Sequence, residues 1–522
     1  MKKVVVVGAG LGGLTAAALL AREGLDVTVL ESHIYPGGCA GTFYYQGYRF
    51  DAGATLAGGF HPGGPMRRLG DILGIRWPSL KTDPAMVAHL SNGDSISLYA
   101  DARRWDERGR VFGSAANEFW HWQERTADAL WDLAERNPLW PPQRPGELFN
   151  LAGTGLRWAL ADLPNRFNGG LLADAVTTLG RRTRHLSPEM KEFLDGQLLI
   201  SAQTTRVHAN ALYAAAALDL PRRGVVHLAG GMGAIAERLV SAITAAGGRV
   251  HYRSPVERIL FLNGRPAGVE TVSGDRWPAD QVILNLPPWN IADILGKSAP
   301  RKLRRLPPKP QDGWGAFTIY LGIPDGSALA GQPIHQQVLT GSSLQRGDSV
   351  FLSISPEGDL NRAPLGARAV TISTHTDLDS WWQLYESDRG AYNARKNQLT
   401  DVLLQSAEIA IPGLRDAAEL ILPGTPVTFE RFTRRHLGWV GGFPQKSLFS
   451  AWGPRLGSGI WMVGDSIFPG QSTAAVALGG MRVSGQILDE IQGRRPKPVI
   501  HWGEASGPYA YQPAQSRRKQ RN

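Results

Sequence analysis

The sequence predicts an α/β protein in which a discontinuous, Rossmann-like domain carries an inserted α+β domain and a helical region. Three observations support this fold class. The chain opens with an apolar run, a glycine-rich turn, a small-residue helical pattern and a second apolar run, an order typical of parallel strands joined by a helix. A similar strand–turn–helix pattern recurs at residues 459–488. The 522 residues, 43% apolar and 20% charged, are enough for two or three globular domains.

The first 31 residues predict a strand–helix–strand unit that binds a dinucleotide. Residues 4–7 and 27–30 are short apolar runs, and residues 14–22 have a helical pattern. The turn Gly8-Ala9-Gly10-Leu11-Gly12-Gly13 matches G-x-G-x-x-G, whose glycines permit the tight turn, the approach of a pyrophosphate and close helix packing. Glu31 ends the second run, where a carboxylate accepts hydrogen bonds from a ribose with a free 2'-hydroxyl, as in FAD or NAD.

The same opening run could be mistaken for a signal peptide or a membrane helix. Lys2 and Lys3 precede an uncharged stretch that reaches Ala21, but four glycines in six positions make a poor helix. No other stretch reaches the ~18 apolar residues that a membrane span requires. We therefore expect that the chain neither crosses a membrane nor carries a recognisable export signal.

A second glycine-rich loop follows soon after Glu31. It reads Pro36-Gly37-Gly38-Cys39-Ala40-Gly41-Thr42-Phe43, and G-Y-R-F-D-A-G-A begins at Gly47. A second glycine-rich loop so soon after Glu31 suggests that its backbone packs against a second flat part of the cofactor. A nicotinamide cofactor would not need this second contact. The two patterns resemble the N-terminal signature of the FAD-dependent phytoene desaturase and amine oxidase superfamily. Cys39 is either a small buried filler or the site of a thioether to the flavin.

Residues 459–488 provide the second part of the expected cofactor site. An apolar run ends in Gly464-Asp465, and Pro469-Gly470-Gln471-Ser472 precedes a helical pattern over 473–488. Such a turn presents N–H donors to an anion or a flavin carbonyl, although Asp465 could instead be a helix N-cap. V-G-D-S-x-F-P-G-Q followed by A-A-V-A-L-G-G resembles the C-terminal FAD segment of carotenoid desaturases and isomerases. This resemblance implies that Asp465 contacts the ribityl or pyrophosphate part of FAD.

The middle of the chain has two interpretations. Glycines at 230–233 precede a helical pattern over 234–246, and Asn263-Gly264 predicts the turn of a β-hairpin. Residues 231–236 also match G-x-G-x-x-A, which would indicate a nicotinamide site, with Arg253 favouring NADP. The family resemblance implies instead that this segment returns to the FAD domain, with the backbone of Val256 at the adenine and residues 282–287 as the closing strand.

The resemblance implies a glutathione-reductase-type FAD-binding domain made of residues 1–75, 222–300 and 425–493. Residues 76–105 and 301–424 are expected to form a substrate-binding sheet domain, with strands at 313–323 and 368–376. Residues 106–221 are expected to be a helical lid or membrane-docking region. Its apolar stripes, such as Leu148, Leu151, Leu156, Leu160 and Leu163, suit either an ordinary core or a membrane-facing helix. Residues 494–522 are expected to be a basic disordered tail.

The expected cofactor-binding residues come from all three FAD segments. No motif identifies a catalytic residue, so the catalytic base stays unassigned. We expect no metal site, because the twelve histidines form no H-E-x-x-H pattern and the single cysteine cannot form a Cys₂ ligand pair. The expected FAD contacts are Gly8, Gly10, Leu11, Gly12, Gly13, Glu31, Gly37, Gly38, Gly41, Thr42, Val256, Gly464, Asp465, Gln471, Ala475 and Val476.

The resemblance also implies an activity. Phe50-Asp51-Ala52-Gly53-Ala54-Thr55 with the later Gly63-Gly64 is most similar to bacterial carotenoid 3',4'-desaturases, which act on hydroxylated acyclic or monocyclic carotenoids. We therefore expect an FAD-dependent oxidoreductase that extends a polyene by dehydrogenation. Four alternatives share the motifs and stay open: a carotenoid isomerase or a retinol saturase, each using reduced FAD, an amine oxidase, and a non-catalytic lipid carrier of the Rab GDP-dissociation inhibitor type.

The charge and the expected substrate class together predict the partners. The net charge of +10 suits nucleic acid or an anionic membrane surface. Basic residues are not interleaved with aromatic residues, so we expect no nucleic-acid partner. A hydrophobic carotenoid resides in lipid, and we therefore expect peripheral contact with the inner, cytoplasmic face of the cell membrane.

Overall fold

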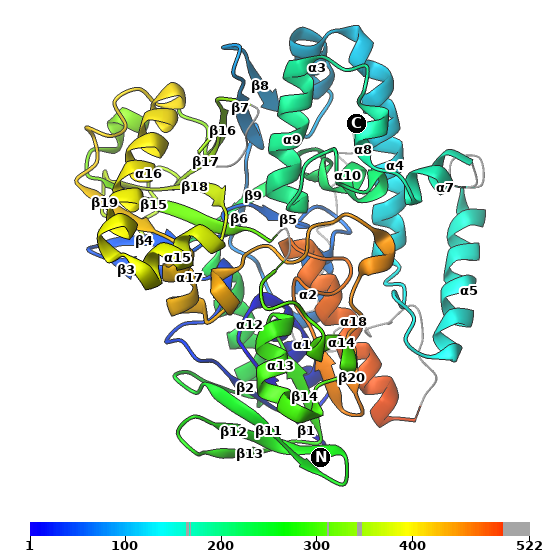
Figure 1. The fold of residues 1–522 in the computed structure, drawn as a ribbon. Helices are drawn as coiled ribbons and strands as arrows, with labels where there is room; N and C mark the ends of the chain where they lie inside the picture. Colours follow the sequence, from blue (N-terminus) through cyan, green and yellow to red (C-terminus); the bar gives the residue numbers. More distant parts are fainter. Residues whose placement is uncertain (163–165, 167–168, 311–312, 342–346, 494–522) are drawn as a thin grey trace, which may run out of the picture.

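A computed structural model describes residues 1–162, 166, 169–310, 313–341 and 347–493 (Figure 1). The predicted basic tail at 494–522 and Leu163 of the helical stripe lie outside these residues. The described chain forms two main sheets and a separate group of helices. Among the described residues, we find no helix that combines the length and apolarity needed to cross a bilayer.

The first sheet draws its six strands from stretches far apart in the sequence. Its order is β10-β2-β1-β14-β21-β20, and only the edge strand β20 is antiparallel to its neighbour. Val5 lies between Thr28 and Val282 in the parallel register. The strands are β10 (Arg249–His251), β2 (Asp26–Leu30), β1 (Lys3–Val7), β14 (Gln281–Leu284), β21 (Ile460–Met462) and β20 (Arg455–Gly457).

α1 (Leu11–Arg22) packs on β1 and β2 of the first sheet, and small residues let α18 (Thr473–Ile491) approach α1, since a Cβ on Gly480 would lie 2.8 Å from the Gly12 carbonyl oxygen. α1 contacts both α12 (Gly233–Ala245) and α18, and α2 (Pro65–Leu73) covers α1 and α18. A small antiparallel sheet contacts the sheet strands β1 and β14. Its strands are β11 (Val256–Leu262), β12 (Arg265–Thr271) and β13 (Arg276–Pro278), and α13 (Pro288–Leu295) packs on β11.

The second sheet has a strict division between its two faces. In β15 (Gly315–Ile323) and β18 (Arg368–Thr376), alternate apolar residues such as Phe317, Ile319 and Ile372 form a core with α15 (Asp379–Ser387) and α16 (Arg389–Ala410). The opposite face carries mostly small and polar residues, with Tyr320 and Phe351 as aromatic exceptions, because side chains alternate along a strand. The order is β19 (Leu420–Gly424), β15, β18, β17 (Ser349–Ile354), β16 (His335–Leu339), β7 (Met86–His89) and β8 (Ser95–Leu98).

Short sheets and helices connect the two halves of the molecule. β3 (Thr42–Tyr45) pairs with β4 (Tyr48–Asp51), and β5 (Ala57–Gly58), β9 (Val225–Leu228) and β6 (Ser79–Lys81) form a three-stranded sheet. α14 (Arg301–Arg304) contacts α13, and α17 (Pro426–Thr433) contacts β15.

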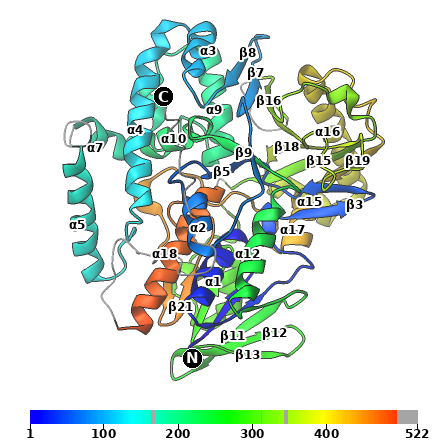
Figure 2. The same cartoon turned by 180° about the vertical axis from the view of Figure 1, so that it is seen from behind.

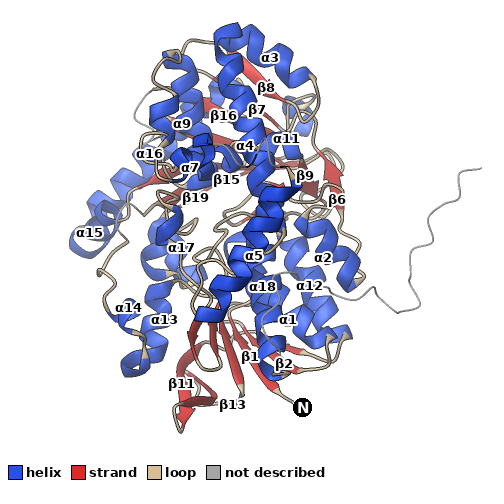
Figure 3. Ribbon diagram, turned by 90° about the vertical axis from the view of Figure 1, so that its right-hand side faces the viewer, coloured by secondary structure: helices blue, strands red, loops and turns tan. Residues whose placement is uncertain are grey.

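In the helical group, α5 and α7 lie on the opposite side of the molecule from α15 and α16, as both front and back views show (Figures 1 and 2), whereas α3 packs on β8 and α9 on β16 of the second sheet. α5 stands at the outside of this group, and the Trp158 indole donates to the Ala129 carbonyl of α4 at 2.9 Å (Figure 3). The helices are α3 (Arg103–Phe112), α4 (Asn117–Glu135), α5 (Pro145–Ala161), α7 (Gly169–Ala175), α8 (Leu179–Arg182), α9 (Pro188–Ala202), α10 (Ala211–Ala217) and α11 (Leu220–Arg223).

The α/β architecture agrees with the sequence-based prediction, and one boundary needs correction. The first helix begins at Leu11, three residues before the expected Leu14. Gly12 and Gly13 therefore belong to its first turn, where a side chain would meet the backbone of Gly464 and Gly8, respectively. The sequence predicts that these glycines end the turn. In the structure they belong instead to the start of the helix and allow it to pack against Gly464 and Gly8. The domain boundaries stay a prediction.

Candidate cofactor and substrate site

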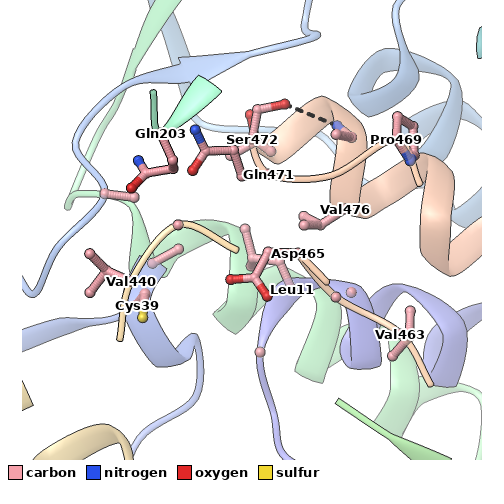
Figure 4. A pocket seen from close by; sticks show the side chains of 18 of the residues that line it. Leu11, Cys39, Gln203, Val440, Val463, Asp465, Pro469, Gln471, Ser472 and Val476 are labelled. Atoms are coloured by element: carbon pink, nitrogen blue, oxygen red, sulfur yellow. Dashed lines mark hydrogen bonds between the residues drawn. The ribbon is translucent and has the colours of Figure 1, made fainter. Parts of the chain in front are cut away.

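A cavity of about 1250 Å³ extends between the first sheet, the second sheet and the helical group. Its lining comes from the N-terminal turn, the loop at 37–40, the start of β11, the segment 463–476, the polar face of the second sheet, and helices α4, α5 and α7. Figure 4 shows Leu11, Cys39, Asp465 and Val476 around this space, with Gln203 and Gln471 at its opposite wall. Segments that are hundreds of residues apart thus share one cavity.

All but three of the predicted cofactor-binding residues line the cavity. The three exceptions are Gly13, Gly41 and Thr42. The residues brought together are Gly8, Gly10, Leu11, Gly12, Glu31, Gly37, Gly38, Val256, Gly464, Asp465, Gln471, Ala475 and Val476.

The N-terminal turn and Glu31 form a compact cradle at the carboxyl ends of β1 and β2. The Ala9 N–H and the His33 N–H each donate to the Glu31 carboxylate at 2.7 Å, which fixes its orientation. Gly8 has a φ of +94°, in the left-handed region that favours glycine. A Cβ on Gly12 would lie 3.0 Å from both the Cα and the N of Gly464, so the N-terminal and C-terminal segments touch.

This cradle fits FAD. α1 and α18 both begin at the cavity, and their free N–H groups favour an anion such as a pyrophosphate. The Glu31 Oε1 accepts from the His33 N–H and the Ser32 hydroxyl, while Oε2 accepts from the Ala9 N–H and retains a lone pair for a ribose hydroxyl. The cavity then continues past the 37–40 loop toward Asp465 and Gln471, which leaves room for a flat ring system beyond the pyrophosphate.

Thr42 and Gly41 do not have the role that the sequence predicts. Thr42 begins β3 and is buried against the turn at 231–233, where a Cβ on Gly231 would lie 2.6 Å from its Cγ2. A Cβ on Gly41 would meet the Tyr35 ring and the carbonyls of Pro36 and Gly38. Both residues therefore shape the loop beneath the cavity instead of facing it. The cause is local packing, since Thr42 fills the space next to Gly231 and Gly233, and Gly41 closes the turn after residues 38–40.

The alternative nicotinamide fingerprint at 231–236 has no open face. A Cβ on Gly231 would lie 2.5 Å from the Asp51 Oδ1, and the Met232 N–H donates to that same oxygen at 2.8 Å. None of these residues lines the cavity. The glycines are needed for close packing on β3 and β4, and this packing leaves no room for a second dinucleotide there.

Asp465 is an ion-pair partner and not a helix cap. The N-cap of α18 is Ser472, whose hydroxyl accepts from the Ala475 N–H at 3.1 Å. Asp465 pairs instead with Arg435 at 2.9 Å, and both side chains are largely buried. Burial alone would lower the pKa of Arg435, but the Asp465 carboxylate raises it, so the guanidinium stays charged. No sequence motif identifies Arg435.

Cys39 lines the cavity close to this ion pair. Burial raises the pKa of its thiol, which keeps it protonated at neutral pH. A protonated thiol is a weak nucleophile. This environment favours the role of a small filler over that of a covalent flavin link.

The rest of the cavity lining is mostly apolar, with polar side chains at the second sheet and at Arg166, Gln203 and Gln445. Trp131, Trp140, Trp158, Leu171 and Tyr213 are among the lining residues of the helical group. The sheet contributes its polar face, with Thr318 opposite Ser373 and Ala316 opposite His375 in the register. The alternation of apolar and polar residues in β15 and β18 could have indicated this face, but nothing in the sequence places it next to the cofactor segments.

Comparison with known proteins gives both a family match and relatives. The sequence model of the family described as flavin containing amine oxidoreductase matches residues 11–318. Prolycopene isomerase 2 of an Oncidium hybrid cultivar is 28% identical over 525 residues, which cover 95% of this chain and 85% of that protein. Hydroxyneurosporene desaturase of Cereibacter sphaeroides is 31% identical over 297 residues, or 54% of this chain and 56% of that protein.

Solved structures resemble most of the chain. An oxidoreductase from Methanosarcina mazei superimposes with a TM-score of 0.62 at 19% identity, covering 92% of this chain and 99% of that one. At this level of identity the likeness concerns the fold, and it confirms the predicted α/β fold class.

Proposed function

The chain belongs to the flavin-containing amine oxidoreductase family, in its carotenoid desaturase and isomerase group, and on this premise we propose that it desaturates a carotenoid. It is an FAD-dependent oxidoreductase that acts on carbon–carbon bonds. The proposed reaction is the 3',4'-desaturation of a hydroxylated acyclic or monocyclic carotenoid. The observation that carries the proposal is the continuity of the dinucleotide cradle with a long apolar cavity.

The lining of the cavity suits a polyene. Its walls in the helical group are aromatic and aliphatic side chains, including Trp140, Trp158 and Leu171, which contact hydrocarbon without leaving polar groups unpaired. When bound, FAD supplies a hydride acceptor. The protein orients the saturated end of the polyene toward the cofactor segment and excludes water from the reacting bond.

The removal of hydride also requires the loss of a proton from the neighbouring carbon. Asp465 is committed to its ion pair with Arg435 and is not a free base. Burial lowers the pKa of His375 to about 4, which keeps this imidazole neutral at physiological pH. A neutral imidazole can accept a proton, but its low pKa makes it a weak base. The proton acceptor stays unassigned.

An isomerase is the second candidate, and the similarity to prolycopene isomerase over nearly the whole chain favours it. The reaction products separate the candidates. Desaturation removes two hydrogens, isomerisation removes none, and saturation of the retinol-saturase kind adds two. A non-catalytic carrier is disfavoured because the glycines and the acid of the cofactor cradle are intact.

Expression in a host that accumulates lycopene and its 1-hydroxylated relatives tests the reaction. We expect a product that has lost two hydrogens and absorbs at longer wavelength, because each added double bond extends the conjugation. The measurement is mass spectrometry with the absorption spectrum of the extracted pigment. A product of unchanged mass with altered geometry would identify an isomerase instead. Glu31→Ala, which removes the ribose acceptor, serves as the inactive control.

We also propose that the outer face of α5 and α7 docks on the membrane that holds the substrate. Leu148, Phe149, Leu156 and Leu160 of α5 are more than half exposed, and Phe149 is 82% exposed. Leu172 of α7 is 73% exposed and also lines the cavity, so this surface adjoins the mouth of the cavity. Exposed apolar residues on an amphipathic helix favour burial at a lipid interface. We call Leu148, Phe149, Leu156, Leu160 and Leu172 the α5/α7 surface.

Charged substitutions on the α5/α7 surface should weaken binding to lipid vesicles. We expect the double variant Phe149→Glu, Leu160→Glu to reduce binding to phosphatidylethanolamine–phosphatidylglycerol vesicles at least ~10-fold, since each buried side chain contributes roughly 1.5–3 kcal/mol. Sedimentation with vesicles measures this change. Leu365→Glu is the matched control, because Leu365 is 87% exposed on a different part of the molecule. Equal vesicle binding by all three proteins would refute the docking proposal.

A further inference from the structure

The sheet end of the cavity contains a buried polar pair formed by Gln203 and His375. Gln203 follows α9 and is 5% exposed, while His375 projects from the polar face of β18. Both residues line the cavity. Neither belongs to a cofactor motif, and the proposed dehydrogenation assigns no role to either. A polar pair needs an explanation in a cavity whose other substrate-facing walls are largely hydrocarbon.

The hydrogen bonds of this pair leave one acceptor without a partner. The Gln203 side-chain Nε2 donates to the Leu199 carbonyl and to the His375 Nε2, each at 3.3 Å. The Gln203 Oε1 is buried and has no hydrogen-bond partner. Leaving a buried acceptor unpaired costs roughly 1–3 kcal/mol of desolvation. A ligand that donates a hydrogen bond to the Gln203 Oε1 would remove this cost.

The imidazole of His375 provides the complementary donor. Because its Nε2 accepts from Gln203, the ring proton of the neutral tautomer resides on Nδ1. Burial lowers the pKa of His375 to about 4, so the neutral form persists at physiological pH. The pair therefore offers one acceptor, the Gln203 Oε1, and one donor, the His375 Nδ1–H. This combination is the complement of a hydroxyl group, which both donates and accepts.

The position of Gln203 is held by the surrounding structure. Its φ is +57°, a left-handed conformation that is uncommon for a residue other than glycine. The Trp314 indole donates to its carbonyl at 3.0 Å, and Gly441 packs directly on its amide. Gln203 is the C-cap of α9, and this αL helix ending fixes the direction in which its side chain leaves the helix. Figure 4 shows the Gln203 amide beside that of Gln471 at the cavity wall.

We propose that Gln203 and His375 bind the terminal hydroxyl of the carotenoid and so select a hydroxylated end group for desaturation. This inference rests on the proposed function, which is carotenoid desaturation. The hydroxylated end lies at the sheet, next to the cofactor segment, and the apolar remainder of the polyene extends toward α5 and α7. The opposite orientation would leave the Gln203 Oε1 unpaired and would place the hydroxyl among tryptophans. The pair thus determines both substrate selection and the direction of binding.

Binding of three acyclic carotenoids to the FAD-loaded enzyme tests the proposal. The probes are 1-hydroxylycopene, 1-methoxylycopene and lycopene, and quenching of flavin fluorescence reports the dissociation constants. We expect the wild type to bind the hydroxylated probe at least ~10-fold more tightly than lycopene, because a site built for a hydroxyl rejects the analogue that lacks it. The methoxylated probe, which accepts but cannot donate, should bind with intermediate affinity or worse.

Substitutions of the pair should remove this preference. Gln203→Met and His375→Phe are each expected to bring the ratio of dissociation constants to within about 3-fold, mainly by weakening the binding of 1-hydroxylycopene. His375→Asn retains a nitrogen donor near the position of Nδ1 and should retain part of the preference. Gln383→Met makes the same chemical change on the exposed side of α15 and should leave the ratio unchanged.

The possible failures are distinguishable. Equal binding of 1-hydroxylycopene and lycopene by the wild type would overturn the inference, as would an undiminished ratio in both Gln203→Met and His375→Phe. In either case, desaturation of 1-hydroxylycopene would leave the proposed function standing. If the FAD-loaded enzyme binds none of the probes, both the proposed function and this inference are wrong. The wild-type ratio needs no variant, so misfolding of a variant does not affect the test.

Discussion

Gly12→Val is expected to yield a folded protein that has lost most of its affinity for FAD. A Cβ at this position would lie 3.0 Å from the Cα and the N of Gly464, and neither backbone atom can turn away as a flexible side chain could. The branched side chain would therefore push α1 away from the turn that carries Asp465. Overpacking of this kind costs about 1–3 kcal/mol, or roughly 10–100-fold in cofactor affinity.

The ratio of flavin absorbance to protein absorbance in the purified variant measures this loss, and titration with FAD gives the affinity. Gly153→Ala in α5 is the matched control, because its added Cβ meets nothing within 4 Å. It should keep its flavin and gain up to ~1 kcal/mol of helix stability. Stoichiometric FAD with unchanged affinity in Gly12→Val would show that the two segments do not jointly form the cofactor site.

Asp51→Ala is expected to lower the free energy of unfolding severely, because it breaks a buried ion pair. Asp51 is buried, accepts from the Met232 N–H at 2.8 Å, and pairs with the Arg362 guanidinium at 2.9 Å. Arg362 is itself only 3% exposed. Loss of the Asp51 carboxylate would leave the buried Arg362 charge without a counterion, which costs about 3–5 kcal/mol. Denaturant unfolding monitored by tryptophan fluorescence measures the change.

A second substitution identifies the cause of this loss. Arg362→Met removes the buried charge, so the double variant Asp51→Ala, Arg362→Met should recover about half of the lost stability or more. Asp401→Ala breaks the exposed ion pair with Arg415 and should change the unfolding midpoint little. An Asp51→Ala protein within about 1 kcal/mol of wild type would contradict the view that this pair stabilises the fold.

Gly12 and Asp51 illustrate what a family pattern does and does not indicate. Both belong to motifs that suggest FAD binding, but only Gly12 lines the cavity. Asp51 connects β4 to the turn before α12 and to Arg362, far along the chain. A residue of such a motif can therefore stabilise a loop without contacting the cofactor. Thr42, which packs against Gly231 and Gly233, is a second example.

The fold class and the core of the cofactor cradle could be predicted because they depend on local constraints. The turn at 8–13, the helix after it and Glu31 lie within one strand–helix–strand unit, in which residue spacing alone determines the geometry. The hairpin at Asn263-Gly264 and the strands at 315–323 and 368–376 also follow from short-range patterns. These features required no knowledge of how distant segments meet.

The substrate end and the ion pair at Asp465 could not be predicted, because no local pattern specifies long-range contacts. Arg435 contacts Asp465, and Gln203 contacts His375, only because the two sheets and the helical group pack around one cavity. Their chemistry depends on burial, which neutralises His375 and leaves the Gln203 Oε1 without a partner. The sequence by itself determined that a dinucleotide cradle forms, since neighbouring residues build it. Only the tertiary structure decided which polar groups face the substrate, since desolvation and proximity arise from the packing of the whole chain.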